Sequence, residues 1–331
     1  MKKSEKAAKT LAFMQTHIIN DGVISELKKL KAAENQHLEV AVFLDNSKSA
    51  LKDDTKKPVQ EVILGGLKFK VLFCYEETLK AFNLPFNADF EHNVSIDKSL
   101  WHNGDYSFYL MRHYFADFDF YWHFDYDVFY NDKDYTSFFE CYKDDNTDLI
   151  VSNFHKLPLD SDWCWIKGAQ WLYKNDEMYA CFYPAPRMSA RLVDALYQKR
   201  LEHAKMIIKS SIQRKRWANN ELFTATECIK MGFSASALKN HDKMNLDEID
   251  LNTTRLFEKP DKCLYHPVKG EFLKRLEMAA VASKSEFERL KKLEHFSGFV
   301  KFYAKKCFSK LRSKCAKICV LIKHYTKHIF K

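Results

Sequence analysis

The sequence predicts an α/β fold in which helices cover a parallel sheet, and three segments near the amino terminus carry this prediction. Residues 11–16 form a short apolar run that is typical of a buried strand. Residues 23–33 repeat apolar side chains at helical spacing, and residues 37–45 form a second apolar strand. Strands that alternate with a helix in this order are typical of a parallel sheet with helical crossovers.

Later segments extend this pattern of alternating strands and helices. Residues 46–60 are polar and predict a loop, and residues 75–100 predict a loop with short helical pieces. The segment 182–186 contains Pro184 and Pro186, which predict a break in regular structure. The other expected elements are strands at 67–73, 118–124, 148–154 and 262–266, and helices at 105–115, 189–208 and from Asn219 to near Gly232.

Composition and charge limit the class of protein. The chain has 331 residues, of which 46% are hydrophobic, so it can bury a large core. The net charge is +9, but residues 296–331 hold ten Lys or Arg and no Asp or Glu, which leaves residues 1–295 close to neutral. Because the excess charge belongs to one segment, we expect no nucleic-acid partner.

The cysteines and the amino terminus predict a cytoplasmic protein. The nine cysteines are odd in number and include no CxxC pair, which favours a reducing compartment. The first residues lack the apolar run of a signal peptide. No stretch reaches the roughly 18 uncharged apolar residues that a membrane span requires.

Two acids follow the most aromatic strand of the chain. Asp125 and Asp127 come directly after the apolar segment 118–124. In an open α/β sheet, ligands bind beyond the carboxyl ends of the strands, and carboxylates there can hold Mg²⁺ or Mn²⁺ together with a phosphate. The alternative is that the two acids only end a strand and begin a turn, where Asp is common.

The ordered segments resemble bacterial members of the glycosyltransferases with the GT-A fold. The matching pieces are LAFMQTH with NDGVISELKKLK, VAVFLD, DFYWHFDYDVF, PRMSARLVDAL, NNELFTATECIKMGF and LYHPVKG. The resemblance covers roughly residues 10–270 and implies a Rossmann-type mixed sheet flanked by helices. It divides the chain into a catalytic domain at 1–270 and a helical, basic extension at 271–331.

The resemblance implies a role for particular residues. Asp125 and Asp127 match the family's D-x-D motif, which binds Mn²⁺ or Mg²⁺ and, through the metal, the diphosphate of the donor. The other implied roles are a nucleotide contact for Thr16 and Asp45, a phosphate contact for Arg187, a metal or diphosphate contact for His266, and a catalytic base for Glu221.

Each of these residues also has a structural interpretation. Asp45 could cap a turn, His266 could be a loop residue beside Pro267, and Arg187 could pair with an acid. Glu221 could simply favour a helix start, which would lower its pKa. The group of Trp163, Trp165 and Trp171 could stack on a sugar ring or pack in the core.

The implied reaction moves a sugar from a nucleotide-sugar donor to a glycan or lipid-linked acceptor, as in bacterial surface polysaccharide synthesis. A single base suffices if the anomeric centre inverts, so we expect an inverting enzyme. The alternatives are a metal-dependent phosphohydrolase or nuclease, and a non-catalytic membrane-associated interaction protein.

The carboxyl-terminal segment predicts a basic amphipathic helix. From Val300 to Ile322 the apolar residues follow one helical face, while most Lys and Arg residues fall elsewhere. Such a helix is typical of a peripheral anchor on an anionic membrane, here the inner face of the cell membrane. The alternative is a helix packed on the catalytic domain with a solvated basic face.

Overall fold

The computed structural model describes residues 8–47, 49–51, 53, 57–85, 100–208, 217–239 and 260–268. The chain divides into two compact units, one formed by Met1–Ile249 with Lys259–Gly270, the other by Asp250–Glu258 with Glu271–Lys331. The second unit, and with it the predicted basic helix, lies outside the described residues.

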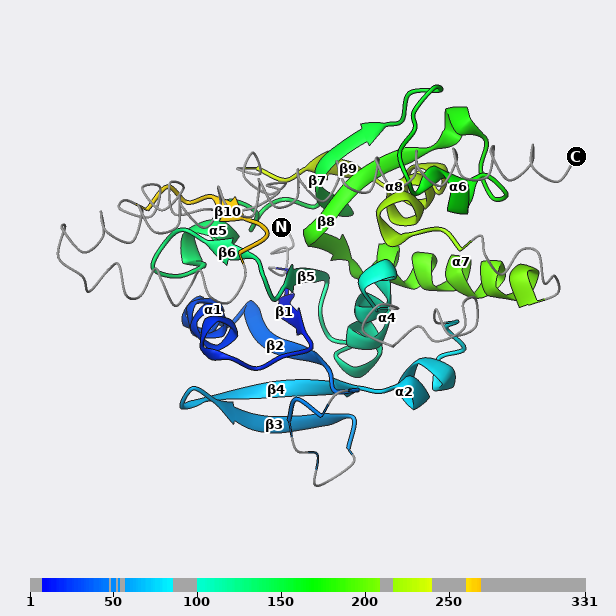
Figure 1. Ribbon diagram of the computed structural model, residues 1–331. Helices are drawn as coiled ribbons and strands as arrows, with labels where there is room; N and C mark the ends of the chain where they lie inside the picture. Colours follow the sequence, from blue (N-terminus) through cyan, green and yellow to red (C-terminus); the bar gives the residue numbers. More distant parts are fainter. Residues whose placement is uncertain are drawn as a thin grey trace, which may run out of the picture. The chain divides into compact units, whose positions relative to one another are not determined.

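A mixed sheet forms the centre of the first unit (Figure 1). Within the described residues its strand order is β3-β4-β2-β1-β5-β8-β7-β9. The strands are β1 (Thr10–Thr16), β2 (Leu38–Asp45), β3 (Val59–Leu64), β4 (Leu67–Cys74), β5 (Phe120–Asp125), β7 (Leu149–Lys156), β8 (Tyr179–Ser189) and β9 (Ala235–Ala237). Strands β4, β2, β1 and β5 are parallel, whereas β8 runs antiparallel between β5 and β7. The predicted mixed α/β sheet is therefore confirmed.

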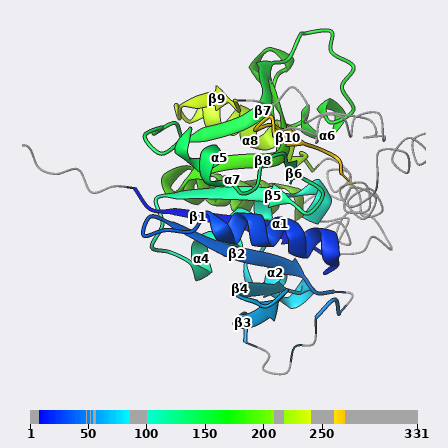
Figure 2. The same cartoon turned by 90° about the vertical axis from the view of Figure 1, so that its left-hand side faces the viewer.

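Helices cover both faces of this sheet, as Figures 1 and 2 show. The helices are α1 (Asp21–Ala32), α2 (Glu76–Ala81), α4 (Asp105–Tyr114), α5 (Thr136–Glu140), α6 (Ile166–Ala169), α7 (Ala190–Ile208) and α8 (Asn220–Lys230). Helix α1 packs on one face together with α5, and α4, α7 and α8 pack on the other.

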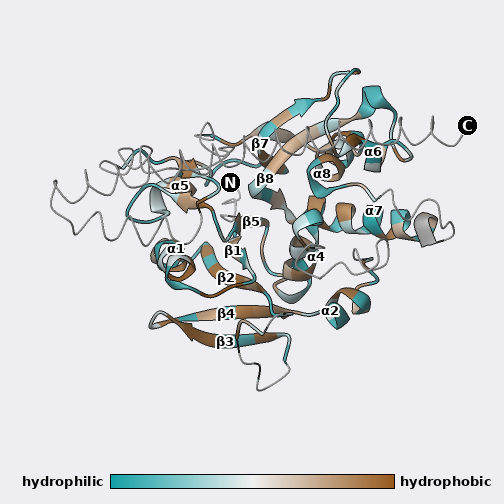
Figure 3. Ribbon diagram, viewed as in Figure 1, coloured by the Kyte–Doolittle hydropathy of each residue, from teal (hydrophilic) through white to brown (hydrophobic). Residues whose placement is uncertain are grey.

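Strand β1 shows why both faces of the sheet are covered. Its side chains alternate between the two hydrophobic clusters: Leu11 and Phe13 face α4 and α8, while Ala12 and Met14 face α1. All four are fully buried. Figure 3 shows the ribbon coloured by hydropathy, with hydrophobic residues along the strands of the sheet. Near-continuous apolar runs are typical of strands that are buried on both sides.

Strand β3 lies partly in the segment predicted to be a loop. Alternating half-exposed residues from Val59 to Leu64 pair antiparallel with β4 at the edge of the sheet. Gly65 and Gly66 form the two-residue turn between the strands, and both have positive φ angles (56° and 85°), as a type I′ hairpin requires.

The predicted break at 182–186 is wrong, because β8 runs through both prolines as an eleven-residue strand. A proline lacks the N–H that a ladder needs, and the pairing of β7 with β8 shifts register between the pairs Ile150–Arg187 and Ser152–Phe182. The prolines lie within this irregular stretch, so the strand continues past them as it does at a bulge.

A second, two-stranded sheet completes the fold. Strand β6 (Phe129–Tyr130) pairs antiparallel with β10 (Leu264–Tyr265), matching Tyr130 with Leu264 and Phe129 with Tyr265. This ribbon brings a segment from late in the sequence to the loop that follows β5.

Candidate functional site

A cavity of about 520 Å³ lies at the carboxyl ends of the parallel strands. The parallel register places Gln15 of β1 beside Asp125 of β5, and Thr16 beside Leu44 of β2, so three strand ends meet at one edge. The residues lining the cavity are Gln15, Thr16, His17, Asp45, Leu100, Trp101, Gly104, His123, Asp125, Tyr126, Asp127, Trp165, Phe182, Tyr183, Pro184, Asn219, Asn220, Glu221, His266 and Pro267.

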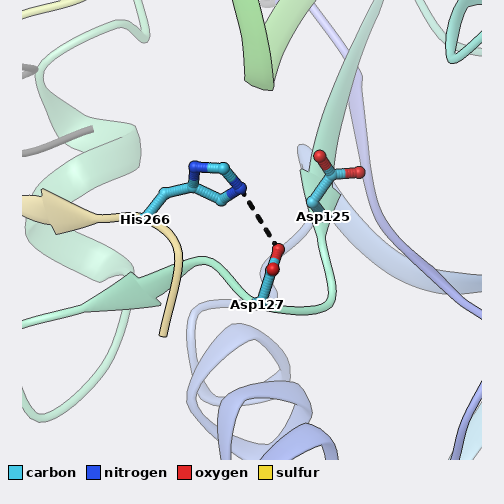
Figure 4. A group of neighbouring side chains, drawn as sticks. All are labelled: Asp125, Asp127 and His266. Carbon is cyan, nitrogen blue, oxygen red and sulfur yellow. Dashed lines mark ion pairs between the residues drawn. The ribbon is translucent and has the colours of Figure 1, made fainter. Parts of the chain in front are cut away.

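Asp125, Asp127 and His266 converge in this cavity (Figure 4). One ligand atom of each residue lies within 4.8 Å of those of the other two, and His266 Nε2 is 3.3 Å from Asp127 Oδ1. Asp127 is largely buried, whereas Asp125 and His266 are partly exposed.

Backbone pairing holds these three side chains together. The Val128 N–H donates to the Asp125 carbonyl at 3.0 Å, which closes a turn between the two acids, and both of them line the cavity. The β6–β10 ribbon continues toward Val128 on one strand and His266 on the other. The Val268 N–H then donates to the Asp127 carbonyl at 2.8 Å.

The donor set fits a divalent cation. Two carboxylates and one imidazole offer the oxygen and nitrogen ligands that Mn²⁺ accepts, while Mg²⁺ prefers oxygen alone. Among the residues that the structure describes, no Lys or Arg lines the cavity, although four carboxylates do. Within the described lining, a divalent cation from solution would balance this concentration of negative charge.

His123 is a cavity residue that the sequence analysis did not identify. Its ring is 1% exposed and stacks on Phe13 with ring centroids 5.3 Å apart. Its Nε2 atom lies 3.1 Å from Asp125 Oδ1. In the sequence, His123 is a single histidine within an aromatic strand, and this context favoured a core position over a site residue.

Glu221 lies at the start of α8, as predicted, and lines the cavity. The Asn219 side chain accepts a hydrogen bond from the Glu221 N–H, and Trp165 Nε1 donates to Glu221 Oε2 at 2.8 Å. Burial raises the pKa of Glu221 to about 7, against the opposing effect of the Trp165 hydrogen bond. The expectation of a lowered pKa is wrong, because loss of hydration outweighs the helix start.

Thr16 and Asp45 lie at the ends of β1 and β2 and line the same cavity. The Thr16 hydroxyl donates to the Ile18 carbonyl at 2.6 Å, so a local turn already uses it. Asp45 Oδ1 accepts from the Ser47 N–H at 3.0 Å, while the buried Oδ2 has no hydrogen-bond partner within the described residues.

Arg187 does not take part in this site. It is 2% exposed, does not line the cavity, and its guanidinium donates to the carbonyls of Tyr142, Asp145 and Thr147. Its charge is matched by Asp145 Oδ1 at 3.2 Å, and it lies over the Phe120 ring at 4.4 Å. The predicted phosphate contact of Arg187 is therefore corrected. Its guanidinium holds the loop 142–147 against the sheet.

Of the three tryptophans singled out in the sequence, only Trp165 lines the cavity. Trp163 and Trp171 pack against the hydrophobic cluster under α4, α7 and α8. Trp101, which the sequence analysis passed over, lines the cavity beside Trp165 and is 68% exposed.

No helix in the described part of the chain combines the length and the hydropathy that a membrane span requires. The predicted membrane-binding face at residues 300–322 lies outside the described residues, so it stays a prediction.

Comparisons with known proteins give two solved structures that resemble this chain. One is mouse xyloside xylosyltransferase 1 in its apo form, with 9% sequence identity, a TM-score of 0.42, and coverage of 78% of this chain and 97% of that chain. Another is galactosyltransferase LgtC in complex with donor and acceptor sugar analogues, with 12% identity, a TM-score of 0.41, and coverage of 83% and 98%. No protein-family model and no curated protein matches the chain. At TM-scores below 0.5 these similarities assign no activity, so the function is inferred below from the cavity.

Proposed function

We propose that this protein is a metal-dependent glycosyltransferase that uses a nucleotide-sugar donor. The observation that carries the proposal is the convergence of Asp125, Asp127 and His266 at the carboxyl edge of the sheet. In α/β folds this edge is where nucleotides and phosphates bind. A cavity of about 520 Å³ is large enough for a ligand of this class.

Asp125, Asp127 and His266 are the residues that would hold Mn²⁺ or Mg²⁺. When bound, the cation would stabilise negative charge on the diphosphate leaving group as a Lewis acid. The imidazole favours Mn²⁺ over Mg²⁺, because Mg²⁺ binds oxygen ligands most readily.

Asp45 would hydrogen-bond to the nucleoside part of the donor. Its buried Oδ2 atom has no partner within the described residues and can accept a hydrogen bond from a base N–H or a ribose hydroxyl. Binding of such a donor group would compensate the cost of a buried, unsatisfied carboxylate oxygen.

Glu221 would act as the general base toward the acceptor hydroxyl. A base works best when its pKa lies near the working pH, and burial brings the pKa of Glu221 to about 7. Its Oε2 atom is held by Trp165 at 2.8 Å, which fixes the carboxylate against the wall of the cavity. Two lining carboxylates, Asp45 and Glu221, lie outside the metal-binding group. With Asp45 assigned to the nucleoside, Glu221 is left as the one base, which suits an inverting displacement. Analysis of the anomeric configuration of the product tests this stereochemistry.

A role in bacterial surface polysaccharide synthesis, with a glycan or lipid-linked acceptor, is part of the same proposal. It places the protein in the cytoplasm at the inner face of the cell membrane, with residues 296–331 as a peripheral anchor. Deletion of these residues should release the protein from anionic liposomes while the melting temperature changes little. A large fall in melting temperature would instead indicate a helix packed on the domain.

The direct test of the activity is a donor panel. The full-length protein is incubated with uridine, guanosine and thymidine diphosphate sugars, with Mn²⁺ or with EDTA, and released nucleoside diphosphate is measured. We expect release from at least one donor that depends on Mn²⁺. Hydrolysis of plain phosphodiesters or of DNA, without any release from nucleotide sugars, would overturn the proposal in favour of a phosphohydrolase or nuclease.

A further inference from the structure

The cavity has a second wall that the metal-binding residues do not use. It is formed by the start of α8, the start of α4 and the segment around Trp165. Trp101 and Trp165 meet here at a ring-centroid distance of 5.8 Å and an interplanar angle of 66°. Trp165 is partly buried, whereas Trp101 is 68% exposed, so one aromatic ring is presented at the mouth of the cavity.

The residues next to Trp101 in the sequence are packed against the rest of the fold. Leu100, the preceding residue, is 2% exposed within the hydrophobic cluster, and His102 contacts the Trp165 ring at 5.4 Å. A Cβ atom on Gly104 would lie 3.1 Å from Asn220 Nδ2, so the chain after Trp101 approaches α8 closely. Trp101 therefore combines an exposed ring with an ordered backbone, so a ligand that contacts the ring does not have to order this segment.

Polar groups beside this aromatic pair suit hydroxyl groups. Asn220 is 3% exposed, and its Oδ1 atom has no hydrogen-bond partner among the residues that the structure describes. Asn220 lines the cavity next to Glu221, whose Oε2 atom accepts from Trp165 at 2.8 Å. A ligand ring that stacks on Trp101 would therefore lie in the same cavity as Asn220 and Glu221, whose side-chain oxygens can accept hydrogen bonds.

The charge of this wall limits the ligand further. Glu221 is its charged group, and the described lining of the whole cavity contains no Lys or Arg to pair with an anion. A carboxylated or phosphorylated group placed here would meet Glu221, and no Lys or Arg among the described lining residues could pair with it.

We propose that Trp101 and Trp165 form the acceptor subsite, and that this subsite takes an uncharged pyranose ring that stacks on Trp101 while a hydroxyl faces Asn220 and Glu221. This inference rests on the proposed function, because it assigns the second substrate of the same reaction. It names the class of acceptor, a neutral sugar residue rather than a uronic acid or a sugar phosphate.

The test measures binding of small neutral and charged sugars to full-length protein loaded with UDP and Mn²⁺. The probes are methyl β-D-glucopyranoside and methyl β-D-galactopyranoside, each paired with its uronide, which differs only by a carboxylate at C6. Saturation-transfer NMR titrations report which ring protons contact the protein and give the affinity.

We expect at least one neutral pyranoside to bind through its C–H face, with its uronide binding at least tenfold more weakly. Trp101→Ala should weaken the neutral pyranoside roughly 3- to 10-fold, the effect of losing one aromatic contact. Leu159→Ala, which removes another exposed apolar side chain (68%) that does not line the cavity, should leave the affinity unchanged.

Three results would overturn the subsite: equal binding of uronide and neutral sugar, unchanged affinity in Trp101→Ala, or no binding of either neutral pyranoside. The proposed function has a separate readout in the same sample, the binding of UDP with Mn²⁺ and with EDTA. Loss of Mn²⁺ dependence there, with pyranoside binding intact, would contradict the transferase and leave a sugar-binding site.

Discussion

Acidic side chains at the two ends of the parallel strands differ in the groups that surround them. Asp148, just before β7, is 1% exposed and accepts hydrogen bonds from Arg191 Nε (2.6 Å), Ser189 Oγ (2.7 Å) and the Ser234 N–H (3.1 Å). Burial alone would raise the pKa of Asp148, but the hydrogen bonds from Arg191, Ser189 and Ser234 lower it to about 2.

At the carboxyl ends of the parallel strands, the neighbours of Asp125 and Asp127 at ion-pair distance among the described residues are imidazoles. His123 Nε2 lies 3.1 Å from Asp125, and His266 Nε2 lies 3.3 Å from Asp127. The difference separates two uses of the same residue type. Asp148, which stabilises the fold, is matched by a cation from the chain. Asp125 and Asp127, the proposed metal ligands, are grouped as acids that bind a divalent cation from solution would be.

The largest expected effect is on turnover and concerns the third kind of acid in the molecule, the proposed base Glu221. Glu221→Gln removes the proposed base, so we expect turnover to fall by about 10²- to 10⁴-fold while donor binding stays near normal. Steady-state assays with saturating donor measure this.

Glu227→Gln is the matched control, because Glu227 lies on the same helix, is 4% exposed and does not line the cavity. It accepts a hydrogen bond from Tyr173 at 2.9 Å, which a glutamine oxygen can also accept. Equal losses of turnover in both variants would contradict a specific role for Glu221.

Metal affinity should distinguish the acids at the two ends of the strands directly. Asp127→Asn removes one ligand, and we expect Mn²⁺ affinity to fall by at least about 10²-fold, since loss of even supporting contacts costs 10- to 100-fold. Asp148→Asn should leave Mn²⁺ affinity unchanged and lower the free energy of unfolding by about 1–3 kcal/mol, because it weakens a buried hydrogen-bonded acid. Electron paramagnetic resonance of free Mn²⁺ and urea denaturation give the two values. Loss of Mn²⁺ affinity in Asp148→Asn, with Asp127→Asn unchanged, would contradict the assignment of these two acids.

The pH dependence of stability tests whether burial raises the pKa of Glu221. Its pKa is raised to about 7 in the folded protein from 4.5, so the unfolded chain releases this proton at lower pH. Between pH 4.5 and 7 the free energy of unfolding should therefore fall as pH rises, by on the order of 2–3 kcal/mol in total. Glu221→Gln should remove this part of the slope. Urea denaturation in EDTA at pH 5 and pH 8 measures it, and parallel slopes in both proteins would show that Glu221 titrates normally.

Periodicity predicted most of the sheet, because strands buried on both sides have continuous apolar runs. It missed β3, whose exposed edge residues resemble a polar loop, and it misjudged β8, because register shifts accommodate Pro184 and Pro186. These outcomes depend on partners in space, which a single segment does not contain.

The candidate site was predicted in part for the same reason. Asp125 and Asp127 follow a strand, so their edge of the sheet could be inferred from sequence order alone. His266 depended on the resemblance, and its approach to Asp127 depends on the β6–β10 pairing across more than a hundred residues. Arg187 was assigned by charge, but Asp145 and three carbonyls use that charge. Trp101 and Asn220 gave no sequence signal, because only the fold places them at a cavity.

The central claim is that Asp125, Asp127 and His266 form a metal site that binds a nucleoside diphosphate. Isothermal titration of UDP and GDP into the full-length protein, once with Mn²⁺ and once with EDTA, tests it most directly. We predict that at least one nucleotide binds at least tenfold more tightly with Mn²⁺ than with EDTA, and that Asp127→Asn loses this gain. Equal affinity with Mn²⁺ and with EDTA would contradict the account.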